Sequence, residues 1–441
     1  STIWPYRTAL PREMNCNFRI IAILSMLLAF GSPINSAQKK ILLGDERVNE
    51  YLPLLEGKRV GVFSNQSGIV GDYSEGLLCP AGVGISDSDA LVAFGTPKEG
   101  QAVKYGPHIV DFLTEKGIEI CTIFSPEHGF RGDADAGEKV SGEIDSKTGI
   151  PIYSLYGKNP KPLSEALSGI DVLLIDIQDV GLRYYTYYIT MLTLMEGCAE
   201  LGKPVIILDR PNPNGFYIDG PILEEEFKSG VGGLPIATVH GLTLGELALM
   251  ANGESWLKGG RKCELTVIEC SGYTHAMKYR LLMRPSPNLK DMKAVYLYAS
   301  TCYFEGTDIS LGRGTDYPFE IYGAPQISGD YSFMPRSMEG AKNPPHLNEL
   351  CHGVSLREKP LEEIWEEGIN LDYLLDAYSK YPEKEKFFLG GGRFFNLLFG
   401  TDEVKEKIET GANAAEISKS WESDLQDYAS LRIKYLLYPL Q

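Results

Sequence analysis

Residues 171–183 read DVLLIDIQDVGLR, an apolar run that ends abruptly in polar and charged side chains. Two other segments have the same form: Ile118 to Phe124 leads into SPEHGFRG (125–132), and Pro204 to Leu208 leads into DRPNPNG (209–215). Short apolar runs bounded by turn residues are typical of buried strands in a parallel sheet. We therefore predict three such strands, whose carboxyl ends lie at one edge of the sheet and form a crevice there.

The predicted strands alternate with predicted helices. A first strand is expected at Arg59 to Asn65, where it ends in a polar turn, and a further strand at Ile150 to Tyr156. A helix near Tyr184 to Leu201 carries apolar residues at helical spacing, and shorter helices are expected near 107–116, 163–167 and 243–257. This succession predicts an α/β fold with a Rossmann-like, doubly wound parallel sheet.

Beyond the last of these helices the loops lengthen and proline and glycine accumulate. We therefore predict a Rossmann-like catalytic domain at 38–260 and a smaller α+β C-terminal domain at 261–441 that closes the cleft. Within the second domain, Cys263 to Cys270 and Lys293 to Ser300 are expected to be strands. The stretch from Leu77 to Gly100 is rich in small and polar residues and is expected to be an insertion or a long loop.

The first 37 residues are predicted to be a signal peptide with an upstream extension. Arg12 and Arg19 precede the apolar run Ile20 to Phe30, and Ser36-Ala37 offers a cleavage site. An uncleaved anchor is the alternative, although about 11 apolar residues is short of the roughly 20 that span a bilayer. The prediction is an exported protein, periplasmic or extracellular, which stays membrane-associated if the signal is retained.

The balance of charged residues limits which classes of binding partner are expected. Asp and Glu total 59 against 42 Lys and Arg, which gives a formal net charge of −17. Such an acidic chain lacks the basic surface that binding to nucleic acid or anionic lipid requires. The eight cysteines include no Cys-x-x-Cys pair, so no disulfide framework is predicted, and a single bridge between Cys263 and Cys270 is left open.

The predicted crevice is rich in carboxylates and in groups that bind polar substrates, which favours hydrolysis over redox chemistry. Its central residue is Glu127, which follows Pro126 and lies between Phe124 and Phe130 in the sequence. Desolvation by these rings would keep its carboxyl group protonated, as a general acid requires. An ion pair with Arg131 or a helix cap is an equally weighted alternative.

Other residues of the crevice have two interpretations each. His128 is either a second acid or base, a donor to substrate, or a structural hydrogen-bond donor. Asp176 lies inside an apolar strand, so it must be either functional or paired with a buried donor. Asp179 lies at the exit of the strand and is less constrained. Zinc would require His128, His240 and Asp209 to meet.

Motifs for cofactors are missing from the sequence. It contains no Gly-x-Gly-x-x-Gly after the first strand, no phosphate-binding loop and no His-Glu-x-x-His. It also lacks the Gly-x-Ser-x-Gly elbow of many serine hydrolases. We therefore predict an enzyme without a metal or organic cofactor.

The chain resembles the NamZ-type exo-β-N-acetylmuramidases from about Leu42 to Tyr438. The resemblance depends on the stretches SPEHGFRG (125–132), DIQDVGLRYYTY (176–187), LDRPNPNG (208–215), and EGT (305–307) with LGRGT (311–315). It implies a Rossmann-like domain, a smaller C-terminal domain, and a cleft that releases N-acetylmuramic acid from the non-reducing end of peptidoglycan fragments. The proposed catalytic glutamate of the family falls on Glu127. The Leu77 to Gly100 region departs from the family pattern.

This resemblance suggests a role for each candidate residue. Glu127 would protonate the glycosidic oxygen, Arg183 or Arg313 would hold the lactyl carboxylate, and a second carboxylate (Asp176, Asp179 or Glu305) would complete a retaining, inverting or substrate-assisted mechanism. The candidate catalytic residues are Glu127, His128, Asp176 and Asp179; the candidate substrate-binding residues are Asn65, Arg131, Arg183, Tyr184, Asp209, Arg210, Asn212, His240, Asn288, Glu305 and Arg313.

Two rival functions remain open at this point. The same cleft would serve a non-catalytic sugar or muropeptide receptor, which a product assay separates from an enzyme. A metal-dependent esterase or deacetylase is a weaker option, which chelation would test. The expected partner is a muramic-acid-terminated saccharide. We expect no binding to nucleic acid and no membrane span after signal cleavage. The oligomeric state is left open.

Overall fold

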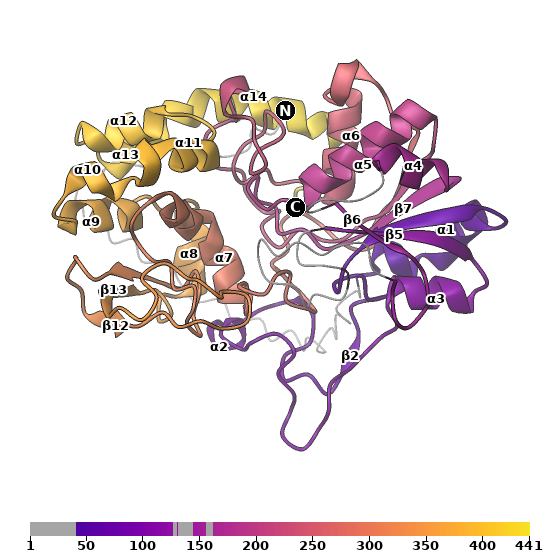
Figure 1. Cartoon of the computed structure of the whole chain (residues 1–441), viewed down its shortest axis with the longest axis horizontal. Coiled ribbons are helices and arrows are strands. Elements are labelled where there is room, and N and C mark those ends of the chain that lie inside the picture. The colour runs from indigo at the N-terminus through magenta and orange to yellow at the C-terminus, as the bar shows by residue number, and fades with distance from the viewer. Residues whose placement is uncertain (1–40, 127–129, 131–143, 156–161) are drawn as a thin grey trace, which may run out of the picture. The chain divides into compact units, whose positions relative to one another are not determined.

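The fold is built on a six-stranded parallel sheet, as seen in a computed structural model that describes residues 41–126, 130, 144–155 and 162–441 (Figure 1). The strand order is β6-β5-β1-β7-β8-β9, and every neighbouring pair is parallel. This is the order of a doubly wound Rossmann-type sheet. The strands are β1 (Arg59–Ser64), β5 (Glu119–Ser125), β6 (Ile152–Ser154), β7 (Val172–Asp176), β8 (Val205–Leu208) and β9 (Leu265–Ile268).

Helices cover both faces of this sheet, which explains why its strands are apolar throughout. In β7, Leu173 and Ile175 pack on one face, whereas Val172 and Leu174 pack on the other. Alternate residues of a strand point to opposite faces, so both sets need a covering layer. The first face is covered by α4 (Leu163–Ser168), α5 (Tyr187–Leu201) and α6 (Leu244–Gly253), and the second by α1 (Val48–Leu55) and α3 (Ile109–Glu115).

A mixed α and β region follows the sheet. Its antiparallel sheet has the order β11-β13-β12 and is accompanied by helices, as the sequence predicts for a second, smaller α+β domain. Its elements are α7 (Met292–Thr301), β11 (Ile321–Ala324), β12 (Tyr331–Phe333), β13 (Cys351–Ser355), α8 (Leu361–Glu367), α9 (Asp372–Lys380), α10 (Lys384–Phe387), α11 (Arg393–Phe399), α12 (Glu403–Glu409), α13 (Ala414–Ser418) and α14 (Glu422–Arg432).

Short elements complete the described chain. The 3-10 helices are η1 (Gly44–Glu46), η2 (Glu225–Phe227), η3 (Lys258–Gly260), η4 (Cys302–Gly306), η5 (Leu389–Gly392), η6 (Lys419–Trp421) and η7 (Ile433–Tyr435). None of the helices in the described ranges has the length and hydropathy that crossing a membrane requires.

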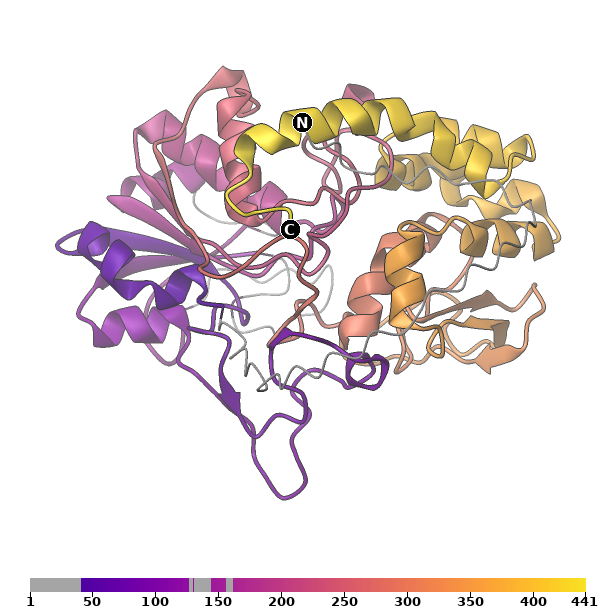
Figure 2. The same cartoon turned by 180° about the vertical axis from the view of Figure 1, so that it is seen from behind.

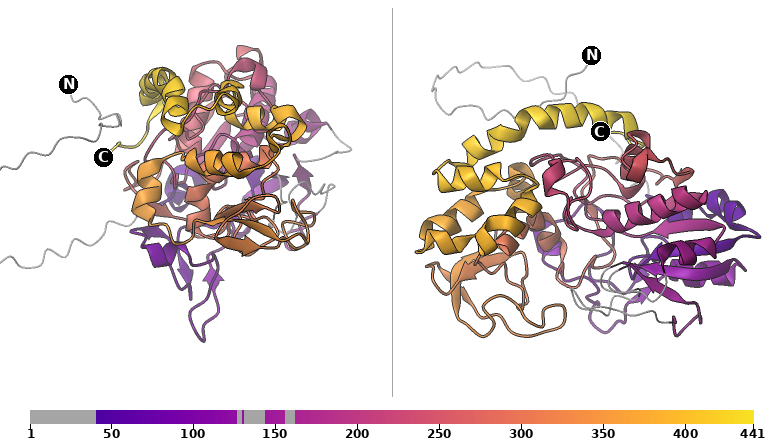
Figure 3. Two further views of the ribbon diagram at one scale, coloured as in Figure 1. Left: turned by 90° about the vertical axis from the view of Figure 1, so that its left-hand side faces the viewer. Right: turned by 45° about the horizontal axis from the view of Figure 1, so that its top comes forward.

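The predicted insertion between Leu77 and Gly100 forms an irregular segment with little regular structure. Two two-stranded ladders hold it: β2 (Ser74–Glu75) pairs with β4 (Lys104–Tyr105), and β3 (Gly82–Val83) pairs with β10 (Tyr279–Arg280). One short helix, α2 (Asp87–Ala90), lies within it. Figure 3 shows the segment projecting from the sheet.

Residues 293–300, predicted as a strand, instead belong to helix α7. Aromatic and small residues alternate there, but all ten residues of α7 are buried, so periodicity does not distinguish the two structures. The deciding feature is Asp291, whose side chain accepts from the backbone N–H of Ala294 and caps the helix.

Strand β9 lies beyond residue 260, where the sequence places the start of the second domain. It pairs with β8 in parallel, so the sheet extends past that position. Cys263 and Cys270, at either end of this strand region, are both free thiols, as are the other five described cysteines.

The end of the chain returns to the first domain. Figure 2 shows α14 running back toward α6, and the residues after it dock beside β8. The hydroxyl of Tyr438 donates to Asp209 Oδ2 at 2.6 Å, and the backbone N–H of Leu437 donates to Glu246 Oε1 at 2.8 Å. Both carboxylates are fully buried, so the tail supplies hydrogen bonds that they require.

Replacing Tyr438 by phenylalanine should therefore lower the free energy of unfolding by about 1.5–3 kcal/mol, the usual contribution of a hydrogen bond to a charged group. Chemical denaturation would measure this loss. The matched control is Tyr73→Phe, which removes a hydroxyl from a side chain that is 62% exposed and should change stability by less than about 0.5 kcal/mol. Equal losses in the two variants would contradict the role assigned to the tail.

Candidate functional site

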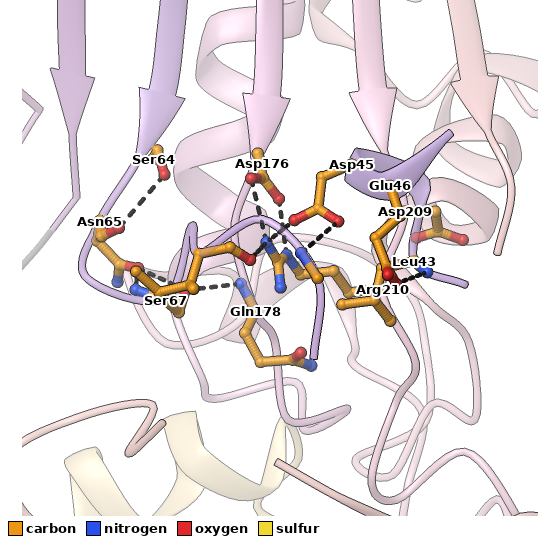
Figure 4. Close-up of polar contacts among 12 residues, drawn as sticks. Leu43, Asp45, Glu46, Ser64, Asn65, Ser67, Asp176, Gln178, Asp209 and Arg210 are labelled. Carbon is orange, nitrogen blue, oxygen red and sulfur yellow. Dashed lines mark hydrogen bonds and ion pairs between the residues drawn. The ribbon is translucent and has the colours of Figure 1, made fainter. Parts of the chain in front are cut away.

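The candidate site lies where the strand order of the sheet reverses. From β1 the chain moves outward to β5 and β6, and then returns to β7, β8 and β9 on the other side. Open α/β sheets bind ligands outside the carboxyl ends of the strands at such a reversal. Ser64 at the end of β1 is in register with Asp176 at the end of β7. Figure 4 shows the polar side chains that gather beyond these two strand ends.

Arg210 forms the centre of a buried ion network at this point. Its guanidinium binds Asp176 through two contacts of 2.7 and 3.1 Å, and Asp45 at 2.7 Å. It also donates to the carbonyl of Ile69 at 3.0 Å. Arg210 therefore joins the segment before β1, the loop after β1 and the end of β7 (Figure 4). Asp176 and Arg210, predicted for catalysis and substrate binding, bind each other instead.

The network changes the titration of Asp45 and Arg210. Burial raises the pKa of Asp45 to about 7, an effect that the Arg210 charge opposes and the neighbouring Asp176 reinforces. Burial disfavours the charge on Arg210, but Asp176 and Asp45 outweigh this and raise its pKa above the ordinary value. Arg210 therefore stays charged within the fold, and its charge is neutralised locally.

A chain of hydrogen bonds links the ends of β1 and β7. The backbone N–H of Gln178 donates to Ser67 Oγ at 3.0 Å, and the Ser67 hydroxyl donates to Asn65 Oδ1 at 2.6 Å. The backbone N–H of Ser67 also donates to Asn65 Oδ1, at 2.9 Å. Because a backbone N–H can only donate, Oδ1 and Nδ2 of Asn65 are assigned without ambiguity.

The backbone of Asn65 is held as firmly as its side chain. His108, the N-cap of α3, accepts from the N–H of Val110 through Nδ1, so its Nε2 carries the proton and donates to the Asn65 carbonyl at 2.7 Å. Gly68 allows the close approach of these groups. A Cβ atom at this position would lie 2.1 Å from Ser64 Oγ and 3.2 Å from the Asp176 carbonyl, so only glycine fits.

Three buried polar atoms at neighbouring strand ends lack a hydrogen-bond partner in the described structure. They are Asn65 Nδ2 after β1, Ser125 Oγ at the end of β5 and Asp179 Oδ2 after β7. These strands are adjacent, in the order β5-β1-β7. Buried polar groups are almost always paired, and each exception calls for a specific explanation. A polar ligand that binds at this edge of the sheet would supply the missing partners.

Asp179 is poised to exchange a proton near neutral pH. Its Oδ1 accepts from the N–H of Gly181 at 2.7 Å, and its exposed fraction is only 6%. Burial raises the pKa of Asp179 to about 7, although the backbone N–H groups of Gly181 and Val180 act in the opposite direction.

His240 faces Asp179 from the neighbouring segment. Its Nδ1 accepts from the N–H of Leu242 at 3.2 Å, and burial, with the charges of Arg432 and Arg183, lowers its pKa to about 3. The ring is therefore neutral and carries its proton on Nε2, which lies 3.9 Å from Asp179 Oδ1 and has no partner. Both residues are predicted site residues, and the fold brings them together.

Arg183 has a structural role rather than the predicted contact with a substrate carboxylate. Its side chain is completely buried, and its two terminal nitrogens donate to four backbone carbonyls, those of Pro221, Ile236, Leu398 and Phe399. The last two carbonyls belong to the C-terminal end of α11, where a cation is favoured. Arg183 thus ties α11 to the loop after β8 and leaves no terminal N–H for a ligand.

Four other predicted ligands are also engaged by the protein itself. Asp209 accepts from Thr243 Oγ1, from the N–H of Gly245 and from Tyr438, and burial raises its pKa to about 6. The remaining three are almost fully buried and contact backbone groups: Tyr184 the carbonyls of Tyr298 and Ala299, Asn212 the carbonyl of Leu242 and the N–H of Asn214, and Asn288 the carbonyl of Gly340.

Glu305 and Arg313 lie in the second region and form an ion pair, with Arg313 Nε 3.0 Å from Glu305 Oε1. Each side chain is 25% exposed, which leaves both accessible to solvent. Glu127, His128 and Arg131 lie outside the described residues. Over the described ranges, no three His, Cys, Asp or Glu side chains are grouped as a metal site would require.

Three residues of the candidate site are not predicted by the sequence: Asp45, Ser67 and His108. Asp45 lies in a short 3-10 helix before the first strand, and no spacing connects it with Arg210, 165 residues later. His108 precedes a predicted helix, where it could have been recognised as a cap. Ser67 lies in the polar turn after the first strand, so its position was a usable signal.

The pKa of Asp179 predicts a change in stability with pH. Because the pKa of Asp179 is about 7 in the folded protein and the ordinary value for an aspartate is 3.8, the unfolded chain loses this proton first, and stability should fall as pH rises from about 4 to 7. Asp179→Asn removes this titration. Because only the folded protein keeps the proton over about two pH units in this range, the variant should reduce the loss of unfolding free energy between pH 5 and pH 8 by about 2.5–3 kcal/mol, at about 1.4 kcal/mol per pH unit.

Urea denaturation at the two pH values would measure the effect. Asp316→Asn, at a side chain that is 82% exposed, provides a control that should keep the parental pH dependence. If Asp179→Asn also keeps it, Asp179 is ionised throughout this range.

Comparison with known proteins agrees with this architecture. A family model described as "Exo-beta-N-acetylmuramidase NamZ, N-terminal" matches residues 96–293, and its C-terminal counterpart matches residues 296–438. Two crystal structures of DUF1343 family proteins from Bacteroides fragilis NCTC 9343 are similar. One is 49% identical, with a TM-score of 0.78 over 91% of this chain and 99% of that chain; the other is 29% identical, with a TM-score of 0.67 over 90% and 99%.

A characterised relative extends the comparison to nearly the whole chain. The peptidoglycan beta-N-acetylmuramidase NamZ of Bacillus subtilis (strain 168) is 37% identical, and the alignment covers 95% of this chain and 99% of the relative. Both halves of the chain match the family in the expected order. The chain therefore belongs to the NamZ family of exo-β-N-acetylmuramidases.

Proposed function

We propose that this protein is an exo-acting glycoside hydrolase that releases N-acetylmuramic acid from the non-reducing end of peptidoglycan fragments, in the turnover of cell walls. The observation that carries the proposal is the row of unpartnered polar atoms on Asn65, Ser125 and Asp179, at three adjacent strand ends. A sugar presents hydroxyl and amide groups that would pair with such atoms. The 37% identity with a peptidoglycan muramidase supports this class of substrate.

For the second catalytic carboxyl group, Asp179 is favoured over the two other candidates. Asp176 is bound by Arg210, and Glu305 is bound by Arg313. Asp179 has a free oxygen and a pKa raised to about 7 by burial. A carboxyl group that titrates near neutrality is suited to proton transfer or to donating a hydrogen bond, and less suited to acting as a nucleophile.

The proposed reaction begins with Glu127, whose protonated carboxyl group donates to the glycosidic oxygen as the bond to the sugar breaks. Asp179 would then assist the attack of water or orient the 2-acetamido group. The separation of the two carboxyl groups in a substrate complex would distinguish these routes, since about 5–5.5 Å suits a retaining pair and about 6.5–9.5 Å an inverting pair.

The direct test is incubation with a disaccharide that carries N-acetylmuramic acid at its non-reducing end, followed by detection of the free sugar. Release of that sugar is expected. A receptor that only binds saccharides would release none at any pH, and this result would overturn the proposal. Unchanged activity after chelation would exclude a metal-dependent hydrolase.

The variant Glu127→Gln should lower turnover of the natural disaccharide by about 10²–10⁴-fold, because it keeps the shape of the side chain and removes the transferable proton. Turnover of an aryl glycoside should fall much less, since its leaving group hardly needs protonation. Steady-state kinetics on both substrates would check this. Turnover of the disaccharide within a few-fold of the parent, in a folded variant, would exclude Glu127 as the general acid.

We also propose that the protein is exported by its N-terminal signal, on the basis of Arg12, Arg19 and the apolar run Ile20 to Phe30. Cleavage after Ala37 would give a mature protein that begins at Gln38. N-terminal sequencing of protein recovered outside the cytoplasm would identify the new terminus. Recovery of the full-length chain in the cytoplasm alone would contradict export.

A further inference from the structure

The amide group of Asn65 is fixed in one orientation before any ligand binds. Two donors from Ser67 hold its Oδ1, at 2.6 and 2.9 Å, so the side chain cannot flip without breaking both contacts. The Ser67 hydroxyl is itself fixed by the N–H of Gln178 at 3.0 Å. His108 and Ser64 also contact the Asn65 carbonyl, at 2.7 and 3.3 Å. The N–H groups on Nδ2 therefore point in a single direction.

These N–H groups have no acceptor, although Asn65 has an exposed fraction of 0%. Leaving a buried donor unpaired is unfavourable, so the fold gains no stability from Nδ2. The contacts from Ser67, His108 and Gln178 nevertheless hold it at the reversal point of the sheet, one residue beyond the end of β1. An arrangement that is unfavourable in the free protein and rigidly maintained is typical of a preformed ligand contact.

We propose that Asn65 is a specificity-determining residue, whose Nδ2 donates a hydrogen bond to an uncharged acceptor oxygen of the terminal sugar, a hydroxyl or the acetamido carbonyl. Ser67 is its positioning residue, since Ser67 contacts the amide oxygen and leaves the nitrogen free. This inference rests on the proposed function for the identity of the sugar. The donor requires an acceptor atom on the ligand, because Nδ2 carries two N–H groups and no lone pair that accepts.

The test exchanges the donor for an acceptor of the same shape. Asn65→Asp keeps the oxygen that accepts from Ser67 and replaces Nδ2 by a second oxygen. The kcat/KM for the disaccharide should fall about 10–100-fold at neutral pH, which corresponds to the loss of one buried hydrogen bond to the sugar. The free protein loses no paired group, but a carboxyl group at this fully buried position carries a desolvation cost of its own, so kcat/KM is compared under conditions in which the variant is folded.

Asn252 provides a matched control in helix α6. Its Nδ2 donates to the carbonyl of Cys263 at 3.0 Å and its Oδ1 accepts from the N–H of Cys263 at 2.8 Å, so its amide group is fully paired. Asn252→Asp should lower the melting temperature and leave kcat/KM unchanged, whereas Asn65→Asp should lower kcat/KM. An unchanged kcat/KM in folded Asn65→Asp would overturn the proposal and make Asn65 a structural residue.

Two further measurements separate this inference from the proposed function. Calorimetric binding of N-acetylmuramic acid to the intact protein does not depend on catalysis, and Asn65→Asp should weaken it about 10-fold or more. If the parent binds the sugar and releases none from the disaccharide, the proposed function fails while the role of Asn65 stands.

If Asn65→Asp does not fold, the variant Ser67→Ala replaces it. Ser67→Ala keeps the backbone contact to Asn65 Oδ1 and should raise KM more than it lowers kcat. An unchanged KM would overturn the proposal.

Discussion

The buried contact between Arg210 and its two aspartates is the constraint on which the site depends. One guanidinium joins Asp176 at the end of β7, Asp45 in the segment before β1 and the carbonyl of Ile69 in the loop after β1. Removing any one partner would leave an uncompensated charge in a region closed to water, which is far more costly than the net contribution of the contact itself. The three segments are therefore held in one arrangement, and the hydrogen-bond chain from Gln178 through Ser67 to Asn65 is built on that arrangement.

This organisation separates the polar residues of the strand ends into two groups. Asp176, Asp209, Arg210 and Asn212, together with the two terminal nitrogens of Arg183, form hydrogen bonds within the protein and maintain the positions of the loops. Asn65, Ser125, Asp179 and His240 each retain a buried polar atom without a partner. The rigidity of the first group allows the second to stay unpaired, because a mobile loop would relax until such atoms reached water or one another.

The sheet, and the polar strand ends that form the candidate site at its edge, could be predicted from the sequence, because an apolar strand that breaks into charged residues has few structural alternatives. The strand predicted at Lys293 to Ser300 was wrong, since the helix α7 that forms there is buried on every side and carries no amphipathic period. The roles of individual residues were harder to predict. Arg183 and Asp179 occur in the same motif, four residues apart, yet one is engaged by four carbonyls and the other has a free oxygen. Those carbonyls belong to residues as far as 216 positions away in the sequence, and a local sequence pattern contains no information about contacts at that separation.

The docking of the C-terminal tail has a consequence for how the molecule is made. Tyr438 reaches Asp209 across 229 residues of sequence, so the strand β8 that carries Asp209 to the sheet edge is synthesised long before its last hydrogen-bond partner exists. During synthesis, an incomplete chain must keep that carboxylate hydrated or protonated. The first domain thus reaches its final stability only after residues 437 and 438 have left the ribosome, and its assembly depends on a segment far beyond the domain boundary.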